Sequence, residues 1–135
     1  MYVTDSPTRG IWAYDYDAES GSISNKRMFF KLNEDDEGVL DGCTIDTDGN
    51  LWAAVHEGSR LLKISPEGKV IGQVKIPAWK ATCPCFGGPD LDELFITTAG
   101  VGDGEKAPEG SGAHGSLFRV KTAAKGLRSN KFGPF

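Results

Sequence analysis

Residues Leu40–Pro77 read LDGCTIDTDGNLWAAVHEGSRLLKISPEGKVIGQVKIP. The stretch contains four short runs of apolar and β-branched residues, separated by three compact turns that each carry a glycine able to adopt positive φ. Runs this short predict strands rather than helices, and turns this tight make consecutive strands antiparallel. The stretch therefore predicts a four-stranded antiparallel meander, with strands at Cys43–Ile45, Leu51–Val55, Leu61–Ile64 and Val70–Ile76.

Partial copies of this pattern occur on both sides of it. Met1–Asp5 and Gly10–Tyr16 align with the second and third strands of the meander, as do Leu94–Thr98 and Gly115–Val120. The repeats recur every ~45 residues, the period of a four-stranded blade of a β-propeller. A single sheet cannot bury both faces, so such repeats must stack. We expect an all-β, partial β-propeller with blades at about 1–32, 41–77 and 81–121, and keep a β-sandwich as the alternative.

Composition and charge exclude several classes of function. The 15 basic and 19 acidic side chains give a net charge of −4, which leaves no basic footprint for a nucleic-acid partner. No apolar run approaches the length of a membrane span, and no signal peptide is visible at the N-terminus. The three cysteines, an odd number, lie on predicted strands. We therefore expect reduced thiols and a cytoplasmic location.

The length of the chain is a constraint of its own. A closed propeller needs at least four blades of about 45 residues each. The 135 residues of this chain supply roughly two and a half such blades. Either the sequence is part of a longer protein, or several copies assemble to close a ring.

Several motifs together resemble the SMP-30/gluconolactonase/regucalcin family of sugar lactonases. The resemblance covers nearly the whole chain, in matching order and spacing. It implies a six-bladed propeller with a divalent metal at the mouth of its central channel, of which this chain is the C-terminal part. The motifs are MYVTDS (1–6), IWAYDYD (11–17), LDGCTIDTDGNLWAA (40–54), TCPCFGG (82–88) and GSLFRV (115–120).

Asp41 is the residue that we expect to act as a metal ligand and as a catalytic group. It lies in the connection that enters the innermost strand of the complete blade, and this position faces the channel mouth in a propeller. The resemblance matches Asp41 to the family's metal-binding aspartate, whose Asp-Gly pair usually follows a proline; here Leu40 takes that place. Taken alone, Asp-Gly is also a common turn sequence. The expected ion is Ca²⁺, with Mg²⁺, Mn²⁺ or Zn²⁺ as alternatives.

The resemblance implies hydrolysis of a sugar lactone. The metal would polarise the ring carbonyl, and a carboxylate in the place of Asp41 would accept a proton from the attacking water. No serine lies in a G-x-S-x-G motif, so an acyl-enzyme route has no support. The family's other metal ligands fall outside this sequence, and one carboxylate does not hold a hard ion that needs about six oxygens. We therefore expect the chain alone to be inactive.

The three cysteines and Thr82 are weaker candidates. Cys83 and Cys85 share one face of a predicted strand, and with Cys43 they suggest a soft-metal site. They lack the C-x-x-C spacing of zinc sites, so the preferred interpretation is buried, unpaired thiols near the channel. Thr82 begins an innermost strand and is a candidate to face the channel.

The remaining residues of interest have structural interpretations. We expect an inter-blade core from the aromatic side chains at matched blade positions, turn capping from two aspartates, and surface positions for the two histidines. These residues are Trp12, Trp52, Phe95 and Phe118 for the core, Asp46 and Asp48 for the turn, and His56 and His114 for the surface.

Two functional alternatives to a lactonase stay open. One is a non-catalytic propeller that binds or scaffolds without a metal. The other is a half-propeller whose unpaired blade edges drive self-association into a ring. The sequence identifies neither the sugar lactone nor the metal.

Overall fold

The computed structural model describes residues 1–130 and 133. Over those residues the chain forms ten strands and one single-turn 3₁₀ helix, η1 (Ser6–Thr8), which confirms the predicted all-β character. No helix in the described part of the chain is long and apolar enough to cross a lipid bilayer. The strands are β1 (Tyr2–Asp5), β2 (Gly10–Tyr16), β3 (Ile23–Lys31), β4 (Val39–Ile45), β5 (Leu51–His56), β6 (Arg60–Ile64), β7 (Val70–Lys75), β8 (Ala81–Gly87), β9 (Glu93–Thr98) and β10 (Leu117–Lys121).

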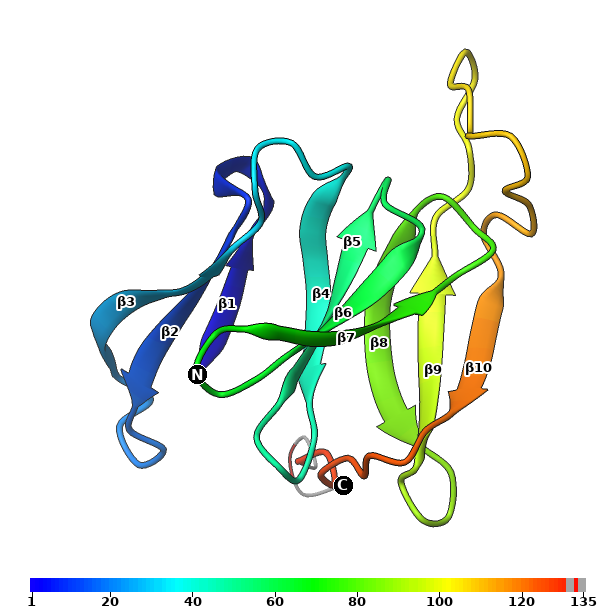
Figure 1. Ribbon diagram of the computed structural model, residues 1–135. Helices are drawn as coiled ribbons and strands as arrows, with labels where there is room; N and C mark the ends of the chain where they lie inside the picture. Colours follow the sequence, from blue (N-terminus) through cyan, green and yellow to red (C-terminus); the bar gives the residue numbers. More distant parts are fainter. Residues whose placement is uncertain (131–132, 134–135) are drawn as a thin grey trace.

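The strands form three antiparallel sheets that lie side by side (Figure 1). The first sheet has the order β1-β2-β3, the middle sheet β4-β5-β6-β7, and the third sheet β8-β9-β10. β4 and β5 contact β8, and β1 contacts β4, so the sheets meet through their first strands. The predicted meander is confirmed, although its first strand begins at Val39 rather than at Cys43.

β5 is buried on both of its faces. All five residues from Leu51 to Val55 are buried. Because side chains alternate along a strand, Leu51, Ala53 and Val55 point toward the first sheet, while Trp52 and Ala54 point toward the third. The middle sheet therefore takes part in two separate cores.

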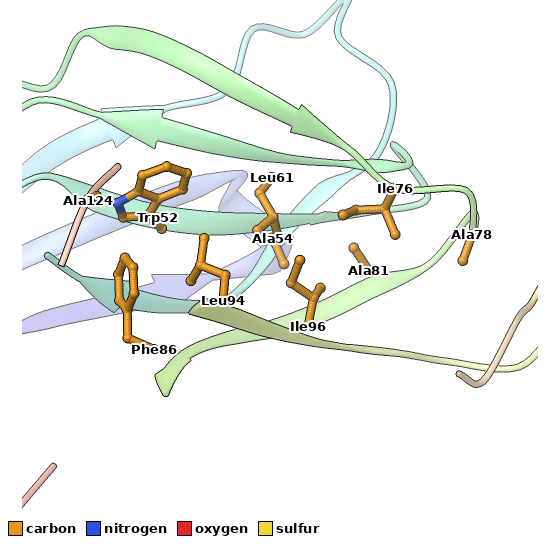
Figure 2. Packing of buried hydrophobic residues seen from close by; sticks show 10 residues of the cluster. All are labelled: Trp52, Ala54, Leu61, Ile76, Ala78, Ala81, Phe86, Leu94, Ile96 and Ala124. Atoms are coloured by element: carbon orange, nitrogen blue, oxygen red, sulfur yellow. The ribbon is translucent and has the colours of Figure 1, made fainter. Parts of the chain in front are cut away.

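The core between the middle and third sheets is built from aliphatic residues around one aromatic pair (Figure 2). The rings of Trp52 and Phe86 meet edge to face, with centroids 6.0 Å apart. Leu61, Leu94 and Ile96 are fully buried beside them. Burying each of these side chains stabilises the fold by about 1.5–3 kcal/mol. The predicted inter-blade role of Trp52 is confirmed, and Phe118 packs against the same cluster.

Trp12 and Phe95 do not belong to either of these cores, so the expectation for them was wrong. Trp12 points away from the buried Ile11, and Phe95 points away from the buried Leu94 and Ile96. Both rings are half-buried. They lie on the outer faces of the first and third sheets, where no further sheet of residues 1–130 and 133 packs.

A buried carboxylate closes the turn between β4 and β5. Asp46 is 1% exposed. Its oxygens accept hydrogen bonds from the backbone amides of Asp48 (3.1 Å) and Asn50 (2.8 Å), from the Asn50 side-chain amide and from the Trp52 indole (3.0 Å). The ammonium of Lys63 lies 3.5 Å away. The predicted capping role is confirmed for Asp46, whereas Asp48 contributes its amide and leaves its side chain exposed.

The segment after β10, which shows no strand period in the sequence, closes the same end of the two sheets. The amide of Thr47 donates to Lys125 O (2.7 Å), and the amide of Gly126 donates to Leu91 O (2.8 Å). Gly126 packs so closely on Phe86 that a Cβ there would lie 2.1 Å from the Cβ of Phe86. The segment thereby ties the Asp46 turn to the third sheet.

Asp46→Asn should lower the free energy of unfolding by about 2–3 kcal/mol. The new side-chain NH₂ group would face the N–H groups that donate to the carboxylate in the wild type, and the substitution would remove the buried negative charge beside Lys63. Urea unfolding of the purified chain measures the effect. Asp48→Asn, in the same turn, is the matched control and should change stability by less than about 0.5 kcal/mol. Equal effects of the two substitutions would contradict the assignment of Asp46.

The same carboxylate should make the stability depend on pH. Burial disfavours ionisation of Asp46, but the hydrogen bonds from Trp52 and Asn50 outweigh it and hold the pKa of Asp46 below its ordinary value of 3.8. A lowered folded-state pKa stabilises the fold above pH 3.8, and this contribution disappears as the pH falls through the folded-state value. Chemical unfolding at a series of acidic pH values should show a shallower loss of stability for Asp46→Asn than for the wild type.

Candidate functional site

Several connections between strands gather at one end of the three sheets (Figure 1). η1, the connection from β3 to β4, the β5–β6 turn and the long connection from β9 to β10 all lie at this end. The Asp46 turn lies at the other end. Asp41 is the third residue of β4, so it lies near the beginning of the strand, toward this end of the sheets.

Asp41 lies on a β-bulge within β4, and not in the connection before the strand as the sequence suggested. Leu40 pairs with Val55, and Cys43 pairs with Ala53. Two residues of β4, Asp41 and Gly42, therefore lie opposite the single residue Ala54 of β5. A bulge re-aims the side chain that it carries and bends the strand. The sequence pattern does not reveal the bulge, because the apolar alternation of β4 begins only after it.

The first sheet holds the residue directly before Asp41. The hydroxyl of Ser6, in η1, donates a hydrogen bond to the carbonyl oxygen of Leu40 over 2.7 Å. On the far side of the bulge, the Thr4 hydroxyl lies 3.7 Å from the Cys43 sulfur and donates toward it. Both contacts come from the neighbouring blade, so the position of Asp41 depends on how two sheets are joined.

The third sheet contacts the residue directly after Asp41. A Cβ on Gly42 would lie 2.8 Å from Thr82 O and 2.6 Å from the Cys83 sulfur. A side chain at position 42 would collide with β8. Glycine at this position therefore lets the backbone of β4 pack directly against the Thr82 carbonyl and the Cys83 side chain of β8. Asp41 is thus fixed between a hydrogen bond from the first sheet and a close contact with the third.

Thr82 occupies the corresponding irregularity of β8. Ala81 pairs with Thr98 and Cys83 pairs with Thr97, so Thr82 is an extra residue on its strand. Its hydroxyl lies 2.7 Å from the hydroxyl of Thr97. The structure therefore puts the two residues singled out in the sequence, Asp41 and Thr82, on matching bulges of adjacent first strands. Thr97 is a further candidate through its contact with Thr82, and no signal in the sequence points to it.

The long connection from β9 to β10 is anchored beside the start of β8. Lys80 is 6% exposed, and its ammonium contacts both carboxylate oxygens of Glu105 at 2.5 Å. This hydrogen bond holds the pKa of Glu105 below its ordinary value. The amide of Ala99 donates to Lys80 O, and the amide of Trp79 donates to Nδ1 of His114 (3.4 Å). The connection is therefore fixed at both of its ends.

The two histidines are less exposed than the sequence suggested. His114 is half-buried, and its ring accepts the hydrogen bond from the Trp79 amide. His56 is also half-buried and is the last residue of β5 rather than part of the turn, because it pairs with Val39.

Asp41 suits a hard divalent ion as one ligand among several. Among residues 1–130 and 133, no group of three or more His, Cys, Asp or Glu side chains is arranged to hold a metal. Within the same residues, the Asp41 carboxylate has no hydrogen-bond donor or cation as a partner, and the residue is only half-buried. A carboxylate with free oxygens is the donor type that Ca²⁺ and Mg²⁺ prefer, but further oxygen ligands have to come from elsewhere.

The thiols are free, as expected, but the expectation that they are buried was wrong. Cys43 is half-buried, whereas Cys83 and Cys85 are exposed. Alternation along β8 turns Pro84 and Phe86 into the core and leaves Cys83 and Cys85 on the opposite face of the strand, where the Cys83 sulfur lies against Gly42 of β4. Burial, together with Cys43, Cys85 and Asp41 nearby, raises the pKa of Cys83 above 9.0. Among residues 1–130 and 133, the thiols are not part of any group of three or more His, Cys, Asp or Glu side chains arranged to hold a metal, so the geometry gives no support to a soft-metal site.

A separate cavity of about 310 Å³ opens between β3 and the β6–β7 pair. Leu32 and Leu62 form its apolar floor, and Lys31 and Arg60 contribute cations at its edge. Asp41 does not line it. Both cations already face carboxylates, Lys31 with Glu34 at 3.0 Å and Arg60 with Asp36 at 3.9 Å.

Comparison with known sequences identifies relatives of this chain. The family model described as the SMP-30/gluconolactonase/LRE-like region matches residues 1–100. Regucalcin from Xenopus laevis is 39% identical over 134 residues, which cover 98% of this chain and 44% of that protein. Pentonolactonase XacC from Haloferax volcanii is 39% identical over 131 residues, which cover 93% of this chain and 44% of the relative.

Solved structures show the same arrangement of sheets. A luciferin-regenerating enzyme superimposes with a TM-score of 0.84 at 43% identity, covering 94% of this chain and 43% of that one. A gluconolactonase from Xanthomonas campestris, XC5397, superimposes with a TM-score of 0.58 at 25% identity, covering 71% and 30%. The predicted partial β-propeller is thereby confirmed.

The chain spans less than half the length of the curated relatives that it matches. The family model covers most of the chain, and the relatives align along nearly all of it. The family suggested by the sequence motifs is therefore confirmed: this chain belongs to the SMP-30/gluconolactonase/LRE-like family.

Proposed function

We propose that this chain is the C-terminal part of a divalent-metal-dependent sugar lactone hydrolase, in which Asp41 is a metal ligand and a catalytic carboxylate. The observation that carries the proposal is the state of Asp41. A bulge presents its side chain, two neighbouring sheets fix the backbone on either side of it, and its oxygens have no partner in residues 1–130 and 133. A free carboxylate held this firmly is suited to bind a ligand.

The relatives support the choice of reaction. Two of them carry lactonase names, a pentonolactonase and a gluconolactonase, and another solved relative is described as a calcium-binding regucalcin. A sugar lactone is therefore the proposed substrate class, and Ca²⁺ is the first ion to test. Mg²⁺, Mn²⁺ and Zn²⁺ are the alternatives, because oxygen ligands accept all of them.

The residues of this chain would then act as follows. A bound divalent ion supplies Lewis-acid polarisation of the lactone carbonyl. Asp41 would contribute a carboxylate oxygen to that ion and accept a proton from the water that attacks the carbonyl carbon; the ring C–O bond would then break, and the leaving ring oxygen would take up that proton to become a hydroxyl. The hydroxyls of Thr82 and Thr97 lie on the adjacent strands, where they can donate hydrogen bonds to sugar oxygens. Gly42, the residue after Asp41, lets β4 approach the backbone carbonyl of Thr82 on β8.

Self-association of half-propellers is the second candidate, and the outer faces of the sheets favour it. The outer face of the first sheet exposes Val3 (39%) and Met28 (43%) on either side of Trp12. On the third sheet, Leu117 is 63% exposed. Apolar sheet faces of this kind favour association with another chain. A ring of copies would also bring several Asp41 side chains to one channel.

In the full-length protein, Asp41→Ala should reduce metal-dependent lactonase activity to background and leave the thermal midpoint nearly unchanged. Removing the carboxylate removes both charge and geometry from the metal site, whereas a half-exposed side chain without partners contributes little to folding. Turnover of gluconolactone at saturating metal measures the effect. Asp48→Ala, an exposed turn residue at the opposite end of the sheets, is the control. Normal turnover by Asp41→Ala would refute the assignment.

Residues 1–135 by themselves should not hydrolyse lactones as a monomer. One carboxylate cannot hold the ion, and the cavity of about 310 Å³ that could enclose a ligand is not lined by Asp41. Gluconolactone turnover with each of the four ions, measured together with the mass in solution, checks this. Metal-dependent turnover by a monomer would contradict it, whereas turnover by an oligomer would support the second candidate.

A further inference from the structure

η1 presents a serine hydroxyl to the strand that carries Asp41. Ser6 begins this single turn, Pro7 fixes its backbone, and Arg9 ends it with φ 56° and an amide hydrogen bond back to Ser6 O (3.0 Å). The Ser6 hydroxyl is therefore held on a rigid turn. It donates to Leu40 O at 2.7 Å, one peptide before Asp41. Leu40 is fully buried, so its carbonyl has little access to water as an alternative donor.

Arg9, the residue that ends the same turn, holds the connection leading into β4. Its guanidinium donates to three backbone carbonyls, those of Asn33 (2.7 Å), Asp36 (2.7 Å) and Gly38 (2.8 Å). The side chain is 19% exposed. A guanidinium is always charged and directs its donors along a fixed fork, so a lysine cannot reproduce three such contacts.

The two residues act on consecutive parts of one path. Arg9 fixes residues 33–38, and Ser6 fixes Leu40, so one turn of the first sheet determines how the chain enters the bulge at Asp41 and Gly42. Neither side chain contacts Asp41 itself. Both contacts run through the backbone, so they set the direction of the Asp41 side chain and not its charge.

We propose that Ser6 and Arg9 are positioning residues for Asp41, and that they fix its carboxylate in the direction needed for metal binding. The proposal rests on the proposed function of Asp41. The first sheet would then contribute to the candidate site, although Asp41 lies on the middle sheet and Thr82 on the third.

The test compares Ser6→Ala with Thr8→Ala in the full-length protein. Thr8 lies in the same turn, but its hydroxyl donates to Asp5 O and not to β4. Ser6→Ala should weaken Ca²⁺ binding by about tenfold in calorimetric titration, the effect typical of residues that orient a metal ligand. Thr8→Ala should leave the affinity within about twofold of the wild type, and Ser6→Thr, which keeps the hydroxyl, should restore most of it.

Amide hydrogen exchange of the metal-free protein provides a readout that does not depend on the ion. Ser6→Ala should accelerate exchange in residues 39–43 and leave the Asp46 turn at the far end unchanged. Arg9→Lys should accelerate exchange in residues 33–38. Its matched control is Arg27→Lys, at an exposed arginine that pairs with Asp15 on the surface of the first sheet.

The outcomes separate the two proposals. Equal exchange and equal Ca²⁺ affinity for Ser6→Ala and Thr8→Ala would overturn the positioning role. A wild-type protein that binds none of the four ions would overturn the proposed function, and the exchange comparison would still decide whether Ser6 holds the segment of Asp41. Faster exchange together with weaker binding supports both proposals.

Discussion

Because β5 buries every side chain from Leu51 to Val55, the middle sheet can be stable only between two neighbours. Its two cores share one strand, with Leu51, Ala53 and Val55 on one side and Trp52 and Ala54 on the other. Each neighbouring sheet therefore contributes to folding through the same strand. The close approach of the first strands, from which the candidate site is built, follows from this stacking.

The two ends of the stacked sheets differ in how their aspartates are bonded. At one end, buried hydrogen bonds to Asp46 and the segment around Gly126 join the sheets through satisfied polar groups. At the other end, Asp41 has no partner in the part of the chain that the structure describes, and its surroundings restrain the backbone instead. A carboxylate that is fully hydrogen-bonded stabilises a fold, whereas one that is held but free can bind a ligand. This contrast distinguishes the two aspartates better than their sequence contexts do.

The sequence predicts most of the fold because the fold depends on local signals. Alternating apolar residues and glycine turns identify the strands, and the repeat identifies the sheets. It predicts Asp41 and Thr82 only through the resemblance of motifs. The bulges at these residues, the hydroxyl of Ser6 and the contact of Gly42 with β8 arise from packing between sheets, and no local pattern records them.

The errors of the sequence interpretation have the same origin. Alternation places Cys83, Cys85 and Phe95 on one face of their sheet, but it does not say which face is covered. For Trp12, Cys85 and Phe95, burial depends on whether another sheet packs against that face. The burial of an apolar side chain was therefore predicted correctly only where another sheet within residues 1–130 and 133 covers it. Trp52, which lies between the middle and third sheets, is an example.

The anchoring of the β9–β10 connection bears on how such proteins diversify. The ends of the connection are fixed by the amide of Ala99 on Lys80 O and by the amide of Gly115 on Ala99 O, and Lys80 with Glu105 fixes it once more. Residues between these points contribute little to either core. Insertions or exchanged loops there would leave the blades intact, so this connection is a natural place for evolution, or for an engineer, to reshape the rim of the propeller without refolding it.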